Sequence, residues 1–313
     1  MTVSQIKTFA VPLPLGQINE EIILNLNEIS MLSTNEIINQ AYKYHEQGNI
    51  KEAIKYYQLS INKNTNNPRV FSNYGVILKD IGNLKEAELA ERKAIKLKPD
   101  FADAYSNLGT ILIDLGKLEE AELFIRKAIE INPNYAIAYS NLGNILRDVG
   151  KLEEAEFLQR KAIKLKPDLA IAYSNLGNVL RDFGKLEEAK LLYLKAIEIN
   201  PKSPLAFCNL GTILRDLGQV KEAESFTRKA IEISPFLAEA YFNLGSILKG
   251  NCEFNEALFN FNKAKELKMN PKKCLAGIGK VLLEQGNYIE GMSKLREGEG
   301  SIIFDLNNGF SLL

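Results

Sequence analysis

The sequence repeats with a period of 34 residues, and this period constrains the fold more than any other feature. Successive units begin, with no slip in register, at Thr34, Pro68, Ala102, Ala136, Ala170, Pro204, Ala238 and Lys272. As one compact globule, a chain of 313 residues would suggest two domains. An internal repeat of this length instead predicts an array in which each unit packs on its neighbours along one axis.

Small residues recur at three positions of the 34-residue unit. Position 8 is alanine in the first unit and glycine afterwards, and positions 20 and 27 are alanine in most units. Positions 4, 7, 8 and 11 share one face of a helix, and positions 20, 24 and 27 share one face of another. A large side chain would separate the two axes, so we expect position 8 to sit against position 20. In the last unit, alanine would serve better than Gly291 and Gly298, which predicts a weak final helix.

Start and stop signals divide each unit into two helices. Position 15 is glycine in every unit except the seventh, which has Cys252. A glycine there can adopt the left-handed conformation that ends the first helix. Glutamates such as Glu153 and Glu154 open the second helix, and prolines such as Pro167 follow its last turn. Each unit is therefore a predicted helical hairpin.

This pattern resembles the tetratricopeptide repeat family. The family signature is read here as Tyr139, Leu142, Gly143, Leu146, Ala155, Ala162 and Pro167. The resemblance covers residues 34 to about 297 and implies an all-α, right-handed superhelical solenoid with a concave groove. The expected units are 34–67, 68–101, 102–135, 136–169, 170–203, 204–237 and 238–271, with a partial eighth unit at 272–297.

The two ends of the chain do not repeat. Within 1–33, apolar residues at helical spacing predict a helix at 19–32 that packs on the first unit. The tail, 298–313, reads as a strand from Ile302 to Leu306, a turn at 307–309 and a strand from Phe310 to Leu313.

Asparagine stands at position 6 of six consecutive units, although it is a mediocre helix former. Its side-chain amide can pair with a peptide backbone. The residues around it resemble the repeat domain of O-linked N-acetylglucosamine transferases, where a row of asparagines at this position, an asparagine ladder, holds extended peptides. Stacked units about 10 Å apart would meet roughly every third residue of an extended chain. The candidate groove residues are Asn73, Asn107, Asn141, Asn175, Asn209, Asn243, Asn144, Asn178, Arg147, Arg181 and Arg215. The alternative is a polar surface inherited by duplication.

The basic residues at position 12 also have two interpretations. They could fix acidic groups of a ligand, or each could be balanced by a nearby Asp or Glu on a solvated face. The two-carboxylate clamp of the chaperone-binding family members needs a lysine at position 5, where this chain has residues such as Ser140 and Cys208. Binding of a chaperone tail is therefore not expected.

Composition argues against several other classes of protein. Lys plus Arg equals Asp plus Glu, at 39 each, so no net charge favours nucleic acid or a membrane surface. One histidine, His45, and three dispersed cysteines predict no metal site, no disulfide framework and a reducing cytoplasm. We expect no signal peptide and no membrane span, because the apolar runs are too short, and we find no phosphate-binding loop or nucleophile motif. We expect neither a cofactor nor catalytic residues.

Three functions remain open from the sequence. The first is a non-catalytic scaffold that binds an extended peptide segment of a partner protein in its groove. The second is a substrate-recruiting arm for a glycosyltransferase-, oxygenase- or methyltransferase-like enzyme whose catalytic domain is lost or lies on another chain, because the tail resembles the start of such a domain in bacterial arrays. The third is self-association through the ends of the array.

Overall fold

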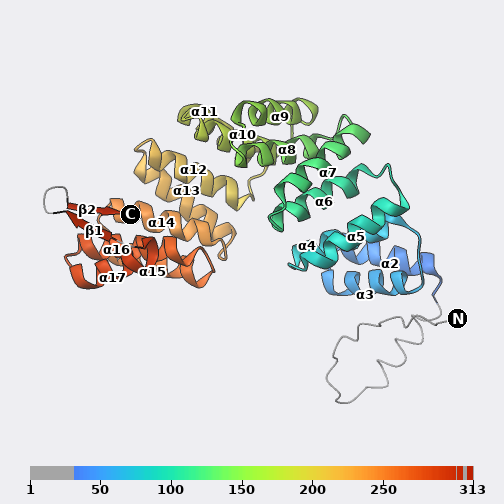
Figure 1. The fold of residues 1–313 in the computed structure, drawn as a ribbon, viewed down its shortest axis with the longest axis horizontal. Coiled ribbons are helices and arrows are strands. Elements are labelled where there is room, and N and C mark those ends of the chain that lie inside the picture. Colours follow the sequence, from blue (N-terminus) through green and yellow to red (C-terminus); the bar gives the residue numbers. More distant parts are fainter. Residues whose placement is uncertain (1–31, 301, 306–308, 313) are drawn as a thin grey trace, which may run out of the picture. The chain divides into compact units, whose positions relative to one another are not determined.

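The computed structural model describes residues 32–300, 302–305 and 309–312, so the helix expected at 19–32 lies outside the described residues. The array divides into two compact units, Met1–Leu115 and Gly116–Leu313. This division falls inside the third predicted repeat, between α6 and α7. The fold class is confirmed: sixteen helices cover the described array, and within each compact unit successive helices pack against one another (Figure 1).

The first unit holds two helix pairs and a fifth helix. Each first helix begins at a predicted repeat start, and α6 packs on both helices of the second pair. The elements are α2 (Thr34–Glu46), α3 (Ile50–Asn62), α4 (Pro68–Asp80), α5 (Leu84–Leu97) and α6 (Ala102–Asp114).

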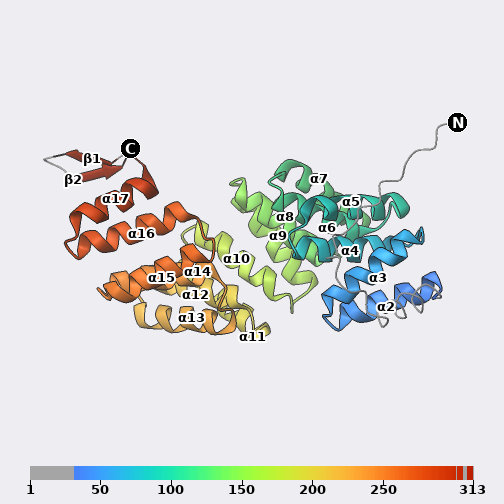
Figure 2. The ribbon, with the colours of Figure 1, turned by 90° about the horizontal axis from the view of Figure 1, so that it is seen from below.

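The second unit begins with α7, which packs on α8, and continues with five helix pairs. The helices are α7 (Leu118–Ile131), α8 (Ala136–Asp148), α9 (Leu152–Leu165), α10 (Ala170–Asp182), α11 (Leu186–Ile199), α12 (Pro204–Asp216), α13 (Val220–Ile233), α14 (Ala238–Gly250), α15 (Phe254–Glu266), α16 (Pro271–Glu284) and α17 (Tyr288–Glu299). Two short strands, β1 (Ile302–Asp305) and β2 (Gly309–Leu312), then pair antiparallel beside α17 (Figure 2).

The glycine at position 15 adopts the left-handed conformation, as predicted. Gly82 has φ 82° and Gly150 has φ 79°, and the N–H of Gly82 donates to Lys79 O. In the seventh 34-residue repeat, Cys252 takes the same left-handed conformation at φ 61°. This conformation costs more free energy for a residue with a Cβ than for glycine.

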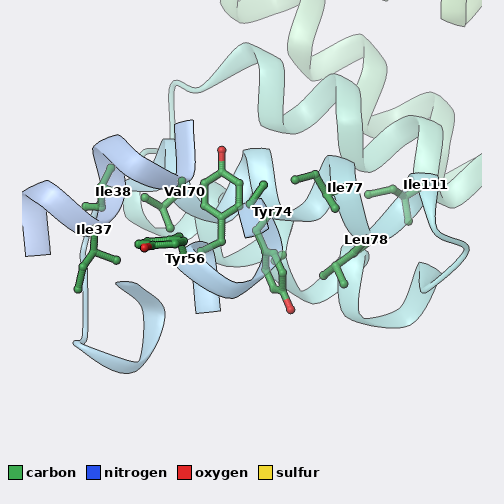
Figure 3. Close-up of a cluster of buried hydrophobic side chains, with 13 residues drawn as sticks. Ile37, Ile38, Tyr56, Val70, Tyr74, Ile77, Leu78 and Ile111 are labelled. Carbon is green, nitrogen blue, oxygen red and sulfur yellow. The ribbon is translucent and has the colours of Figure 1, made fainter. Parts of the chain in front are cut away.

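The larger of two apolar clusters in the first unit lies between its helices (Figure 3). Ile37 and Ile38 of α2 meet Tyr56 of α3, and α4 contributes Val70, Tyr74, Ile77 and Leu78. Ile111 of α6 joins the same cluster. The burial of these side chains holds the helix pairs together, because each helix has only one apolar face to bury.

We expected the glycine at position 8 to sit against position 20, and the backbone of position 20 does lie close to it in two repeats, 3.1 Å from a Cβ on Gly211 and 2.9 Å from one on Gly279. The nearest side chain is the residue at position 24 of the second helix. A Cβ on Gly75 would lie 3.0 Å from Glu91 Oε1, and one on Gly177 would lie 2.9 Å from the Tyr193 ring. The glycine is needed because a side chain of variable size lies across it.

The expectation that alanine would suit position 27 of the last 34-residue repeat better than Gly298 is wrong. A Cβ on Gly298 would lie 2.6 Å from Lys272 O and 2.7 Å from Ala276 N, both of which are backbone atoms of α16. Helices α16 and α17 approach too closely there for a methyl group. Glycine at this position is a packing requirement and not a sign of a weak helix.

Candidate functional site

A groove of about 650 Å³ runs along the second unit, and we call it the central groove. The first helices of five successive pairs, α8, α10, α12, α14 and α16, contribute to it. Its lining is Arg147, Ala170, Ile171, Ser174, Asn175, Asn178, Arg181, Asn200, Ser203, Leu205, Asn209, Thr212, Glu239, Phe242, Asn243, Met269 and Lys273. Amide and guanidinium groups thus alternate with a few apolar side chains.

Six of the eleven candidate residues line the central groove: Asn175, Asn178, Asn209, Asn243, Arg147 and Arg181. Asn141, Asn144 and Arg215 belong to the same unit but not to this lining. Asn73 and Asn107 belong to the first unit, in α4 and α6. Their role in binding a ligand stays a prediction.

Some of the position 6 asparagines have a structural role that the repeat pattern alone did not predict. Asn175 Nδ2 donates to Ser140 Oγ at 3.0 Å, and Asn107 Nδ2 donates to Ser72 Oγ at 3.2 Å. Each bond joins one helix pair to the preceding pair, 35 residues earlier. The recurring serine at position 5 was the available signal, since it supplies the acceptor. One amide proton is thereby committed to the array, which leaves the Oδ1 acceptor for a ligand.

The asparagines of the groove differ in how far they are already engaged. Asn243 Nδ2 donates to Thr212 Oγ1 at 2.9 Å, and Asn178 Oδ1 accepts from Tyr193 OH at 2.7 Å. The Asn209 side chain makes no hydrogen bond with any other residue that the structure describes. Its amide is therefore the most available polar group on the floor of the central groove.

The arginines of the groove are partly balanced by neighbouring carboxylates. Arg147 Nε lies 3.2 Å from Asp182 Oδ2, and Arg181 lies 3.6 Å from the other oxygen of Asp182. Arg215, outside the groove, pairs with its neighbour Asp216 at 2.7 Å. Arg147 also lies 3.1 Å from its neighbour Asp148, so these pairs support the interpretation of the basic track as a balanced face.

A smaller, mainly apolar cavity of about 300 Å³ adjoins the central groove, and we call it the end slot. It shares Phe242 and Lys273 with the groove. Its lining is Phe242, Ser246, Lys249, Phe261, Lys272, Lys273, Ala276, Gly277, Lys280, Gly298 and Glu299. The sequence analysis missed it, because its residues depart from the repeat.

Burial perturbs several titratable groups at position 24 and nearby. Burial raises the pKa of Glu91 to about 9, although hydrogen bonds from Ser72 and Asn107 oppose the shift. Burial also raises the pKa of Tyr57 to about 12 and that of the Cys208 thiol to about 12. A thiol with so high a pKa is a poor nucleophile, so Cys208 serves packing.

Position 22 carries exposed apolar side chains that the sequence analysis also missed. In the second unit, Leu123, Phe157 and Leu191 are each 66% exposed on three successive second helices. Their spacing of 34 residues was visible in the sequence. Nothing else in the structure indicates what would cover them.

Comparison with known proteins agrees with this architecture. The middle tetratricopeptide-like domain of cilia and flagella-associated protein 70 matches residues 39–178. A tetratricopeptide repeat model matches residues 177–218, and a second one matches residues 205–236 and 238–270. The chain therefore belongs to the tetratricopeptide repeat family. No curated protein matches the sequence.

Solved structures support the fold. A tetratricopeptide repeat protein from Parabacteroides merdae ATCC 43184 is 19% identical, with a TM-score of 0.63 over 80% of this chain and 98% of its own. A chain of the APC/C hetero-tetramer Cut9-Hcn1 is 16% identical, with a TM-score of 0.71 over 89% of this chain and 55% of its own. PilF of Pseudomonas aeruginosa is 20% identical, with a TM-score of 0.56 over 69% of this chain and 97% of its own.

Two further observations concern the described residues alone. No cluster of three or more His, Cys, Asp or Glu side chains that could hold a metal ion occurs among them. None of their helices combines the length and hydropathy that crossing a lipid bilayer requires.

Proposed function

We propose that this protein is a non-catalytic scaffold that holds an extended segment of a partner protein in the central groove. Tetratricopeptide repeats commonly bind protein partners, and the fold is typically non-catalytic. The observation that carries the proposal is the groove itself. Its floor presents four asparagine amides from three successive first helices, Asn175 and Asn178, Asn209, and Asn243, across about 650 Å³.

The spacing of these helices supports an extended ligand. First helices that are about 10 Å apart match roughly every third residue of an extended chain, which rises about 3.3 Å per residue. Five first helices would then contact a segment of about 12 residues. Each net hydrogen bond contributes about 0.5–1.5 kcal/mol, whereas ordering each ligand residue costs about 1–2 kcal/mol. Backbone contacts alone would therefore give weak affinity, and side-chain contacts must supply the rest.

The alternative functions have less support. The β1–β2 hairpin, as the remnant of a further domain, is the one feature that would support a recruiting arm of an enzyme. We find no catalytic group among the described residues that adds to this support. Self-association through the ends would rest on the residues before α2, which lie outside the described structure. The scaffold uses a surface that the described residues form.

The Asn209→Ala variant should bind a partner segment up to about tenfold more weakly than the native chain, because it removes one amide contact of about 0.5–1.5 kcal/mol. The array should keep its stability, because the Asn209 side chain makes no hydrogen bond within the described chain. Asn262→Ala is the matched control, since Asn262 is exposed on α15 and bonds only to Leu258 O of its own helix. Affinity is measured by fluorescence anisotropy with a partner-derived peptide. Equal affinities for all three chains would argue against the amide ladder.

A further inference from the structure

The asparagine ladder stops at the end slot. Position 6 is asparagine in α10, α12 and α14, but in α16 it is Gly277. The Phe261 ring occupies the space there: a Cβ on Gly277 would lie 2.8 Å from Phe261 Cε1. The surface that replaces the amide is therefore largely carbon, from Phe242, Phe261 and Ala276. A cavity of about 300 Å³ with such walls is large enough for one leucine or aromatic side chain.

Lysines surround this apolar cavity. Lys249 pairs with Glu284 at 2.9 Å, and Lys280 pairs with Glu299 at 2.7 Å. Lys272 and Lys273 are exposed and have no ion pair with any described residue. Both stand in the first turn of α16, where the helix dipole disfavours cations. Two unbalanced lysines at that place cost stability, and a carboxylate brought by a ligand would offset this cost.

The linings of the central groove and the end slot contain more basic than acidic side chains. The linings of the central groove and the end slot together contain two arginines and four lysines, against Glu239 and Glu299. The chain as a whole has a net charge of zero. Four of these six cations already pair with a carboxylate, so the unbalanced positive charge lies at Lys272 and Lys273, where it attracts acidic ligands and repels basic ones.

We propose that the end slot anchors one apolar side chain of an acidic partner segment, and that Lys272 and Lys273 bind the carboxylates beside that side chain. This inference rests on the proposed function, because the same segment continues along the central groove. The apolar anchor in the slot fixes the register of the segment, and its acidic residues give the specificity that backbone contacts lack.

The test selects binders of the full-length chain from a displayed library of random 16-residue peptides. The expected winners are acidic and share one leucine or aromatic residue, whose replacement by alanine weakens binding about tenfold or more. The double variant Lys272→Glu/Lys273→Glu should lose about tenfold in affinity or more, and less at high salt. Lys166→Glu/Lys221→Glu is the control with the same change in net charge at exposed sites outside both linings.

A second variant examines the end slot itself. Ser246 lines the slot from α14 and is only partly buried, so Ser246→Phe fills the cavity from its rim and leaves the ring packing intact. In this variant, replacing the shared leucine or aromatic residue of the peptide by alanine should no longer weaken binding. This inference would be overturned if the selected peptides are neutral or basic, or if they bind both the Lys272→Glu/Lys273→Glu variant and the Ser246→Phe variant as tightly as the native chain. Either result would leave the central groove as a binding site. A library that yields no binder at all would overturn the proposed function as well.

Discussion

At pH 8 the Glu91→Gln variant is expected to be more stable than the native chain, and its stability should depend less on pH. Glu91 in α5 is fully buried, with Oε1 accepting from Asn107 Nδ2 at 3.2 Å and with Oε2 unpaired. Burial raises its pKa from 4.5 to about 9, so the folded chain keeps the carboxyl protonated at neutral pH.

The sign of the pH dependence follows from proton binding. Between pH 4.5 and about 9, the unfolded chain has lost this proton and the folded chain retains it. The free energy of unfolding therefore falls as pH rises through this window, by at most about 1.4 kcal/mol per pH unit. Glutamine removes this dependence and should add about 2–3 kcal/mol at pH 7.

The chain itself shows that glutamine fits this environment. Gln159 occupies the same position two repeats later, where its Oε1 accepts from Ser140 Oγ at 2.8 Å and its Nε2 donates to Ser140 O at 2.8 Å. Urea unfolding at several pH values between 5 and 9, followed by circular dichroism, gives the comparison. Glu86→Gln, an exposed carboxyl on the same helix, is the control. A Glu91→Gln variant with the native pH slope would show that Glu91 is not buried as described.

The Gly298→Ala variant should destabilise the last helix pair by about 1–3 kcal/mol, even though alanine is the better helix former. The new methyl group would meet backbone atoms of α16 at 2.6 and 2.7 Å, and no side-chain rotation can relieve this contact. Helices α16 and α17 would have to move apart.

Hydrogen exchange measured by mass spectrometry localises this effect, because the terminal unit of a repeat array can open by itself. Peptides from 271–299 should exchange faster in Gly298→Ala, and those from α10–α13 should be unchanged. Ala264→Gly is the matched variant at the same position of the preceding repeat, where the fully buried alanine loses a methyl contact and about 1 kcal/mol of helix propensity. Slower exchange in Gly298→Ala would mean that the two helices are not in close contact.

The sequence predicts those parts of the fold that local chemistry determines. The left-handed glycines, the first-helix starts and the small residues between axes recur because every repeat needs the same backbone geometry. The contact of position 24 with the glycine at position 8 was not predicted, because the residue type at position 24 differs from repeat to repeat. It is Glu91, Gln159, Tyr193, Thr227 and Phe261 in different repeats. Its partners come from tertiary packing, which a repeat pattern does not specify.

The candidate site was predictable in outline only. The asparagine ladder and the arginines were visible as recurring residues, and six of them line one groove. The hydrogen bond from Asn175 to Ser140 spans 35 residues and needs the relative position of two helices. The end slot depends on departures from the repeat: Gly277 lies against the Phe261 ring, and Gly298 lies against the backbone of α16, and both contacts appear only when the helices are placed in space.

Site-specific photo-cross-linking tests most directly whether the central groove holds the partner. Leu205 lines the central groove and is 47% exposed. Leu123 lies in the same compact unit but outside the groove lining, at position 22 of its repeat, and is 66% exposed. Each is replaced in the full-length chain by a photoreactive phenylalanine, and the cells that make the chain are irradiated. The account predicts a protein adduct at Leu205 and none at Leu123; an adduct at Leu123 with none at Leu205 would contradict it.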